Sequence, residues 1–180
     1  MPSPSSPSLA ELVIGGARSG KTAFALERAE RSGLAPVMVA TAEAHDDEMA
    51  ARIAAHRAER DGRWTTVEET RDLVGVLARE SAAGRILVVD CLTLWLSNLM
   101  FAECDVEAEI ERLVEALGAL AGPVVLVTNE VGLGIVPDNG LARRFRDLQG
   151  RLNRRIAAVA GRVTFVAAGL PLVLKGAPSA

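Results

Sequence analysis

The fold is decided near the N-terminus, where residues 12–22 read Leu-Val-Ile-Gly-Gly-Ala-Arg-Ser-Gly-Lys-Thr. An apolar, strand-like run leads into the pattern G-x-x-x-x-G-K-[ST], and a helix-like segment, Thr22–Arg31, follows it. The alternative is a plain glycine turn that happens to contain Lys and Thr, but the strand before and the helix after favour a phosphate-binding loop. In such a loop Lys21 bridges the β- and γ-phosphates and Thr22 offers its hydroxyl to Mg²⁺. The expected nucleotide contacts are Gly15, Gly16, Ala17, Arg18, Ser19, Gly20, Lys21 and Thr22.

Outward from this loop, short β-branched runs alternate with segments of helical period. Apolar spacings of three and four predict a helix from Val106 that is capped by Asp105, and a longer helix from about Leu141 to Ala160. The expected strands are Leu12–Ile14, Val37–Ala40, Ile86–Asp90, Val124–Thr128 and Val163–Val166, with a weaker one at Thr65–Val67. This alternation predicts an α/β fold of the P-loop NTPase type, RecA-like, with a mainly parallel sheet flanked by helices.

The composition predicts one globular domain. The chain has 180 residues, 49% of them hydrophobic and 24% charged, and we expect a disordered tail at 1–10 followed by a single domain at 11–180. A net charge of −3 and only 3% aromatic residues argue against a general nucleic-acid binder. The sequence contains no apolar run long enough for a membrane span and no signal peptide. Two cysteines without metal-ligand spacing suggest a reducing cytoplasm.

An acidic residue on the metal side of the site is expected at the end of the run Ile86–Asp90. A carboxylate that ends a strand parallel to the first can hold a Mg²⁺-bound water, so Thr22 and Asp90 are the expected metal-side residues. The alternative is that Asp90 caps a helix that begins near Leu92. The guanine-binding signature N-K-x-D of regulatory GTPases is absent, and Thr128-Asn129-Glu130 resembles it only superficially.

The segment between the second and third strands carries a cationic pattern. Arg52, His56 and Arg60 repeat every four residues, which places them on one face of a helix. Such a face suits a polyphosphate, and a neutral imidazole can attack phosphorus. The alternative, a solvated surface bordering an apolar stripe, fits the spacing as well. Spacing alone leaves both open.

Four ordered motifs carry a resemblance to a known family. They are the loop Gly15–Thr22, the run Asp46–Ile53 leading to His56-Arg57, the strand end Val89–Thr93, and Thr128–Pro137. From Leu12 to about Gly169 the chain resembles the bifunctional adenosylcobinamide kinases/adenosylcobinamide-phosphate guanylyltransferases of cobalamin biosynthesis.

This resemblance implies two reactions. ATP or GTP phosphorylates adenosylcobinamide, and GTP then donates GMP to adenosylcobinamide phosphate, releasing pyrophosphate. It implies that His56 carries GMP covalently and that the enzyme is a homotrimer. Many family members also have a histidine at the position of Ala55, so the single histidine here makes the assignment clearer. The further implied GTP contacts are Ala40, Thr41, Ala42, Arg57, Ala58, Glu59, Arg60, Glu68 and Asp90.

Some alternatives remain open. Glu68 could accept hydrogen bonds from guanine or ribose, or could be an exposed carboxylate before the next helix. A P-loop small-molecule kinase without nucleotidyl transfer would keep the phosphate loop without needing His56. A RecA-like NTPase module would hydrolyse nucleotide and form no covalent intermediate.

Overall fold

The computed structural model describes residues 8–43 and 62–176. Residues 44–61, which include the cationic segment with His56, lie outside the described residues. β1 (Ala10–Gly15), α1 (Lys21–Glu30) and β2 (Ala35–Ala40) come first. The remaining elements are β3 (Thr65–Glu68), α3 (Leu73–Glu80), β4 (Arg85–Asp90), α4 (Leu92–Phe101), α5 (Val106–Leu117), β5 (Val124–Asn129), α6 (Gly140–Val159), β6 (Arg162–Ala167) and β7 (Leu170–Lys175).

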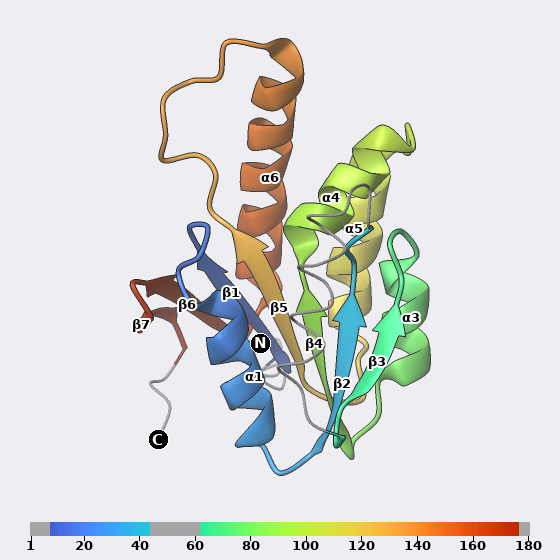
Figure 1. Cartoon of the computed structure of the whole chain (residues 1–180). Coiled ribbons are helices and arrows are strands. Elements are labelled where there is room, and N and C mark those ends of the chain that lie inside the picture. The colour runs from blue at the N-terminus through green and yellow to red at the C-terminus, as the bar shows by residue number, and fades with distance from the viewer. Residues whose placement is uncertain (1–7, 44–61, 177–180) are drawn as a thin grey trace, which may run out of the picture.

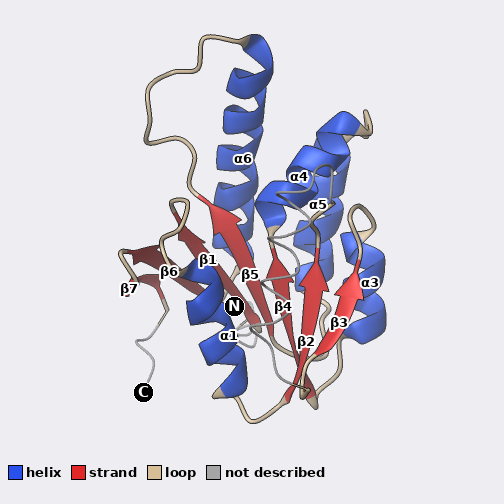
Figure 2. Cartoon of the chain, viewed as in Figure 1, coloured by secondary structure: helices blue, strands red, loops and turns tan. Residues whose placement is uncertain are grey.

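The strands form one seven-stranded sheet in the order β3-β2-β4-β5-β1-β6-β7 (Figure 2). Every neighbouring pair is parallel except β6 and β7, which are antiparallel. All six expected strands are therefore confirmed, including the weak one, which is β3. The mainly parallel α/β fold is confirmed as well.

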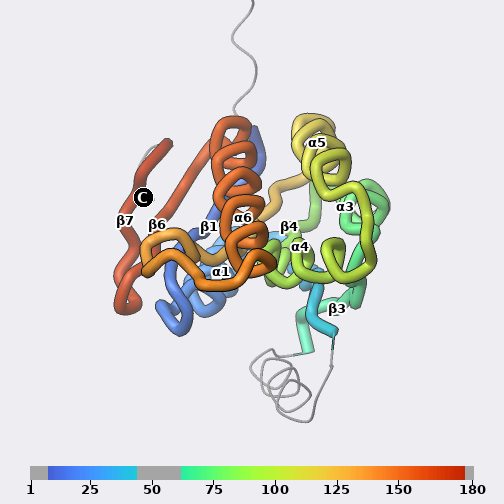
Figure 3. Tube along the Cα trace, turned by 90° about the horizontal axis from the view of Figure 1, so that it is seen from above, coloured from blue at the N-terminus to red at the C-terminus, as the bar shows by residue number. Residues whose placement is uncertain are grey.

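Helices cover both faces of the sheet, as the view from above shows (Figure 3). On one face α1 packs over β1, β4 and β5, around a small core that includes Val13, Val88 and Val127. The larger core lies on the other face, where α3, α4, α5 and α6 pack against one another and the sheet. Neighbouring residues of one strand, such as Leu87 and Val88, enter opposite cores, which explains why the strands lack polar alternation.

The helices differ little from their expected bounds. Asp105 is the N-cap of α5 and its side chain accepts a hydrogen bond from Ala108 N–H at 3.1 Å, as expected. α5 ends at Leu117, and Gly118 is its C-cap. The N-terminal part of α6 and the loop before it extend beyond the ends of the strands (Figure 1).

Two features differ from expectation. β7 was not predicted; it is an exposed edge strand that pairs with β6 across the two-residue turn Ala168-Gly169, both with positive φ. At the other terminus β1 begins at Ala10, which is buried, and Leu9 C=O accepts a hydrogen bond from Val124 N–H. Strand β1 thus begins one residue before the expected boundary between residues 10 and 11.

Candidate functional site

The phosphate loop joins the carboxyl end of β1 to the first turn of α1, as its sequence predicts. Two glycines make its curvature possible. A Cβ on Gly15 would lie 2.2 Å from the carbonyl oxygen of Val166, and Gly20 adopts a φ of 95°, which favours glycine. The turn after β6 supports the loop, because Gly169 N–H donates to Ser19 C=O at 2.9 Å. The loop is therefore held in a defined shape by both flanking strands.

Lys21 is the cation of this loop. Its side chain is buried where α1 begins, and its Nζ donates to Gly16 C=O at 2.5 Å. This bond turns the ammonium back over the loop, beside the N-terminus of α1, where the helix dipole has its positive end. The combination forms an anion site of the kind that holds a nucleotide phosphate.

The two expected metal-side residues lie next to each other. Thr22 Oγ1 donates to Asp90 Oδ2 at 3.0 Å, although the two residues are 68 positions apart in the chain. Asp90 ends β4 and Thr22 lies in the first turn of α1. The N-cap of α4 is Cys91, so the alternative role of Asp90 as that cap is wrong.

A hydroxyl beside a carboxylate, at the mouth of a phosphate loop, is a donor set that suits Mg²⁺, which prefers oxygen ligands and keeps several waters. Within residues 8–43 and 62–176 no group of three or more His, Cys, Asp or Glu side chains could hold a metal by itself. A cation bound here would therefore share its ligands with the phosphates of a nucleotide, as in other phosphate-loop sites.

Thr41 joins the carboxyl ends of β2 and β4. Its hydroxyl accepts from Cys91 N–H at 2.8 Å and donates to Cys91 C=O at 2.7 Å, while its carbonyl accepts from Asn98 Nδ2 at 2.8 Å. Its own N–H donates to Asp90 C=O at 3.2 Å. This fully buried residue therefore fixes Asp90, and the flanking Ala40 and Ala42 are half-buried.

Cys91 adjoins this junction and does not serve as a nucleophile. Burial raises the pKa of its thiol to about 11, and the neighbouring Asp90 carboxylate adds to the increase. The thiol is consequently protonated at neutral pH. Its part in the site is structural.

Glu68 stands apart from the phosphate loop. It is exposed at the end of β3, four strands from β1 in the sheet, which corresponds to about 19 Å at the usual strand spacing. It can therefore approach the base or ribose of an extended nucleotide more readily than the phosphates. His56, Arg57, Ala58, Glu59 and Arg60 lie outside the described residues.

Sequence reasoning missed a polar cluster behind the end of β5. Thr128, Gln149 and Asn153 are buried and hydrogen-bonded together, and Asn153 Nδ2 donates to Asn129 C=O at 3.0 Å. Thr93 Oγ1 accepts from Asn129 N–H at 2.8 Å. Gln149 and Asn153, two polar residues four positions apart beside the apolar stripe of α6, were the signal that could have indicated it.

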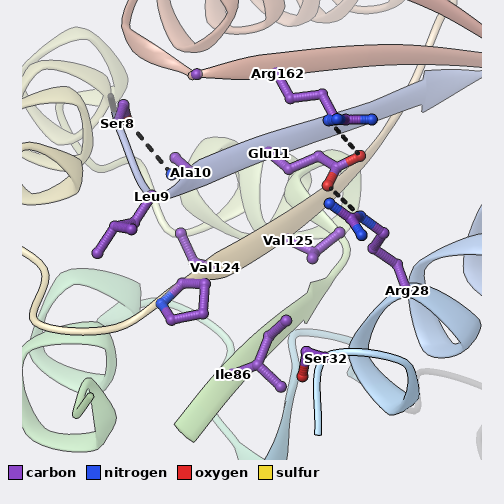
Figure 4. A pocket seen from close by; sticks show the side chains of 12 residues that line it. Ser8, Leu9, Ala10, Glu11, Arg28, Ser32, Ile86, Val124, Val125 and Arg162 are labelled. Carbon is purple, nitrogen blue, oxygen red and sulfur yellow. Dashed lines mark hydrogen bonds and ion pairs between the residues drawn. The ribbon is translucent and has the colours of Figure 1, made fainter. Parts of the chain in front are cut away.

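A cavity of about 290 Å³ lies at the opposite end of the sheet from the phosphate loop (Figure 4). There the buried carboxylate of Glu11 accepts from Arg28 Nε at 2.9 Å and lies 4.0 Å from Arg162 Nε. Thr164 Oγ1 donates to the same carboxylate at 3.3 Å. The cavity opens away from the phosphate loop, and its charged groups are paired with one another.

The sequence is similar to the sequences of known proteins. The sequence profile of a family described as cobinamide kinase / cobinamide phosphate guanyltransferase matches residues 11–174. The bifunctional adenosylcobalamin biosynthesis protein CobP of Pseudomonas aeruginosa is 51% identical over 172 residues, covering 93% of this chain and 98% of that protein. CobU of Salmonella typhimurium, described in the same words, is 40% identical and covers 91% of this chain and 98% of its own length.

Solved structures agree with the fold. The RadB recombinase superposes with a TM-score of 0.54 at 20% identity, covering 88% of this chain and 74% of that one. A Pyrococcus horikoshii protein, PH0250, superposes with a TM-score of 0.56 at 12% identity, covering 94% and 87%. The RecA-like form of the sheet is thereby confirmed.

Proposed function

Because the chain belongs to the cobinamide kinase / cobinamide phosphate guanyltransferase family, it is a bifunctional enzyme of cobalamin biosynthesis, and we propose how its residues divide the two reactions. The first reaction phosphorylates adenosylcobinamide, and the second transfers GMP to the product from GTP. The observation that carries this proposal is the contact between Thr22 and Asp90 at the mouth of the phosphate loop.

The phosphate loop binds the triphosphate of GTP or ATP in this proposal. Lys21 and the loop N–H groups neutralise the phosphates, and Thr22 and Asp90 hold Mg²⁺. When bound, the cation would offset charge that develops on the leaving phosphate oxygens. The loop residues keep the triphosphate in one orientation for in-line attack.

His56 is proposed as the nucleophile for GMP transfer. An imidazole nitrogen attacks the α-phosphorus of GTP, the bond to the β-phosphate oxygen breaks, and pyrophosphate leaves. A phosphate oxygen of adenosylcobinamide phosphate then attacks the same phosphorus and the N–P bond breaks, giving adenosylcobinamide-GDP. Arg57, Ala58, Glu59 and Arg60 are proposed nucleotide contacts beside this histidine, and the two arginines among them suit the charge of the leaving group.

The guanosine end of GTP is proposed to lie over the carboxyl ends of β2 and β3. Ala40 and Ala42 flank the fixed Thr41 and allow a close approach, and Glu68 accepts hydrogen bonds from guanine or ribose. This places the nucleoside several strands from the phosphate loop, in keeping with the position of Glu68 in the sheet.

We also propose a cytoplasmic homotrimer that does not bind nucleic acid. Within the described parts of the chain no helix is long and apolar enough to cross a membrane.

Apolar side chains are exposed in two places that could form subunit contacts. The loop before α6 exposes Leu133, Ile135 and Val136 by 84%, 97% and 63%, and β7 exposes Leu170 and Leu172. Apolar surface of this kind is typical of subunit contacts. Light scattering on the full chain tests the state, and a monomeric mass contradicts it.

Labelling with α-³²P-GTP tests the transfer mechanism. The wild type should retain label on protein that is labile to acid and stable to base, and His56→Ala should retain none. His45→Ala is the matched control, because it removes the other histidine of the chain. His56→Ala should still phosphorylate adenosylcobinamide. GMP transfer by that variant would contradict the role of His56. An active wild type without label would contradict the covalent mechanism and favour a kinase without nucleotidyl transfer.

A further inference from the structure

Glu130 lies beside the phosphate loop, and none of the proposed roles above uses it. It follows β5, and its N–H donates to Gly15 C=O at 2.9 Å. Gly15 pairs with Asn129 in the parallel register of β1 and β5. Glu130 is therefore level with the start of the loop and one strand position from it, about 4.8 Å.

The polar cluster behind β5 holds this position rigidly. Asn129 is fixed through its N–H by Thr93 and through its C=O by Asn153, and Asn153 is bonded in turn to Thr128. Burying polar groups is costly unless they are hydrogen-bonded, and the side chains of Thr128 and Asn153 are bonded to each other. Such a network fixes one geometry for the peptide that precedes Glu130.

The Glu130 side chain is half-buried and is oriented by the turn after it. Gly132 N–H donates to Glu130 Oε1. A carboxylate has about four acceptor positions on its two oxygens, so this hydrogen bond occupies only part of its capacity. The turn thus orients a carboxylate that can still accept a proton.

The other carboxylates at the strand ends are less suited to accept a proton near the γ-phosphate. Asp90 accepts from Thr22 and stands on the proposed metal side. Glu68 follows β3, four strands from β1. Glu43 follows β2, three strands from β1. Among these strand-end carboxylates, Glu130 follows the strand next to β1 and is not one of the two proposed metal-side residues.

We infer that Glu130 accepts the proton of the adenosylcobinamide hydroxyl in the kinase reaction, an inference that rests on the proposed function. The hydroxyl oxygen forms a bond to the γ-phosphorus, the bond to the β–γ bridging oxygen breaks, and the nucleoside diphosphate leaves. The hydroxyl proton passes to the Glu130 carboxylate and then to water. Glu130 thereby serves the kinase reaction and His56 serves GMP transfer, while both reactions use the same triphosphate site.

Three substitutions test this role against a structural one. Glu130→Gln keeps an oxygen that can accept from Gly132 but removes the base, Glu130→Asp keeps the base on a shorter arm, and Glu130→Ala removes both. Glu115→Gln, on the exposed face of α5, is the matched control. We measure kcat and KM for transfer of the γ-phosphate to adenosylcobinamide, and separately GMP transfer to added adenosylcobinamide phosphate.

Glu130→Gln should lower kcat for phosphorylation about 100-fold or more, with the KM for nucleotide changed less than about threefold. GMP transfer should fall far less, and Glu130→Asp should recover part of the kinase rate.

A kinase rate for Glu130→Gln within about fivefold of the wild type would overturn the inference. In that case a loss seen only in Glu130→Ala would assign the residue to the turn at Gly132. An inactive wild type would overturn the proposed function and this role together, whereas an active wild type with an equally active Gln variant overturns the role of Glu130 alone.

Discussion

Asn153→Ala should destabilise the protein strongly, although it removes only one small side chain. Asn153 is 6% exposed; its Oδ1 accepts from Thr128 Oγ1 at 2.7 Å and from Gln149 Nε2 at 2.9 Å, and its Nδ2 donates to Asn129 C=O. The substitution removes three hydrogen bonds, two of them to the buried side chains of Thr128 and Gln149. At about 1 kcal/mol for each lost bond, and more where a partner stays unsatisfied, the free energy of unfolding should fall by roughly 3 kcal/mol.

Urea denaturation followed by circular dichroism measures this change. For a chain of this size the expected loss corresponds to a decrease in Tm of roughly 6–12 °C. Arg154→Ala is the matched control, because the next residue of α6 is exposed and its loss should change stability by less than about 0.5 kcal/mol. A loss for Asn153→Ala below about 1 kcal/mol, or equal to that of the control, would refute the cooperative network.

Three further outcomes are expected. Lys21→Ala should lower both phosphorylation and GMP transfer by about 100-fold or more, because both reactions share its phosphate loop; loss of only one activity would contradict a shared site. Glu11→Gln should cost about 1–2 kcal/mol of unfolding free energy in thermal melts, because Arg28 and Arg162 lose a buried counter-charge; an unchanged Tm would contradict this. Cys91 releases its proton near pH 9 in the unfolded chain and near pH 11 in the folded chain. The free energy of unfolding should therefore decrease as the pH rises from 9 to 11, and the decrease should be smaller in Cys91→Ala.

Local patterns were enough to predict most of the fold. The strands that are buried on both faces are continuous apolar runs, and the helices carry periodic stripes with caps such as Asp105. β7 was not predicted because Phe165–Leu174 reads as one apolar stretch. The turn at Ala168-Gly169 that divides it is identified only by its backbone angles in the structure. Its Leu170 and Leu172 face outward, so no alternation marks the strand.

The candidate site was predictable only where chemistry has a local motif. The phosphate loop has one, and Asp90 ends a distinctive strand, so the contact with Thr22 could be expected. The place of Glu130 depends on β5 lying between β4 and β1, and that order comes from tertiary packing. The role of Thr41 likewise depends on a partner 50 residues away.

The place of β1 in the middle of the sheet also bears on how the protein is made. β1 pairs with β5 and β6, and Glu11 is opposite Arg162, roughly 150 residues later in the chain. At about 5–20 residues per second, a ribosome needs roughly 8–30 s to synthesise that stretch. β1 is the first strand to be translated, but it can pair on both sides only after the last third of the chain has been made. A nascent or truncated chain that stops after β4 therefore lacks both strands that flank β1 and its phosphate loop.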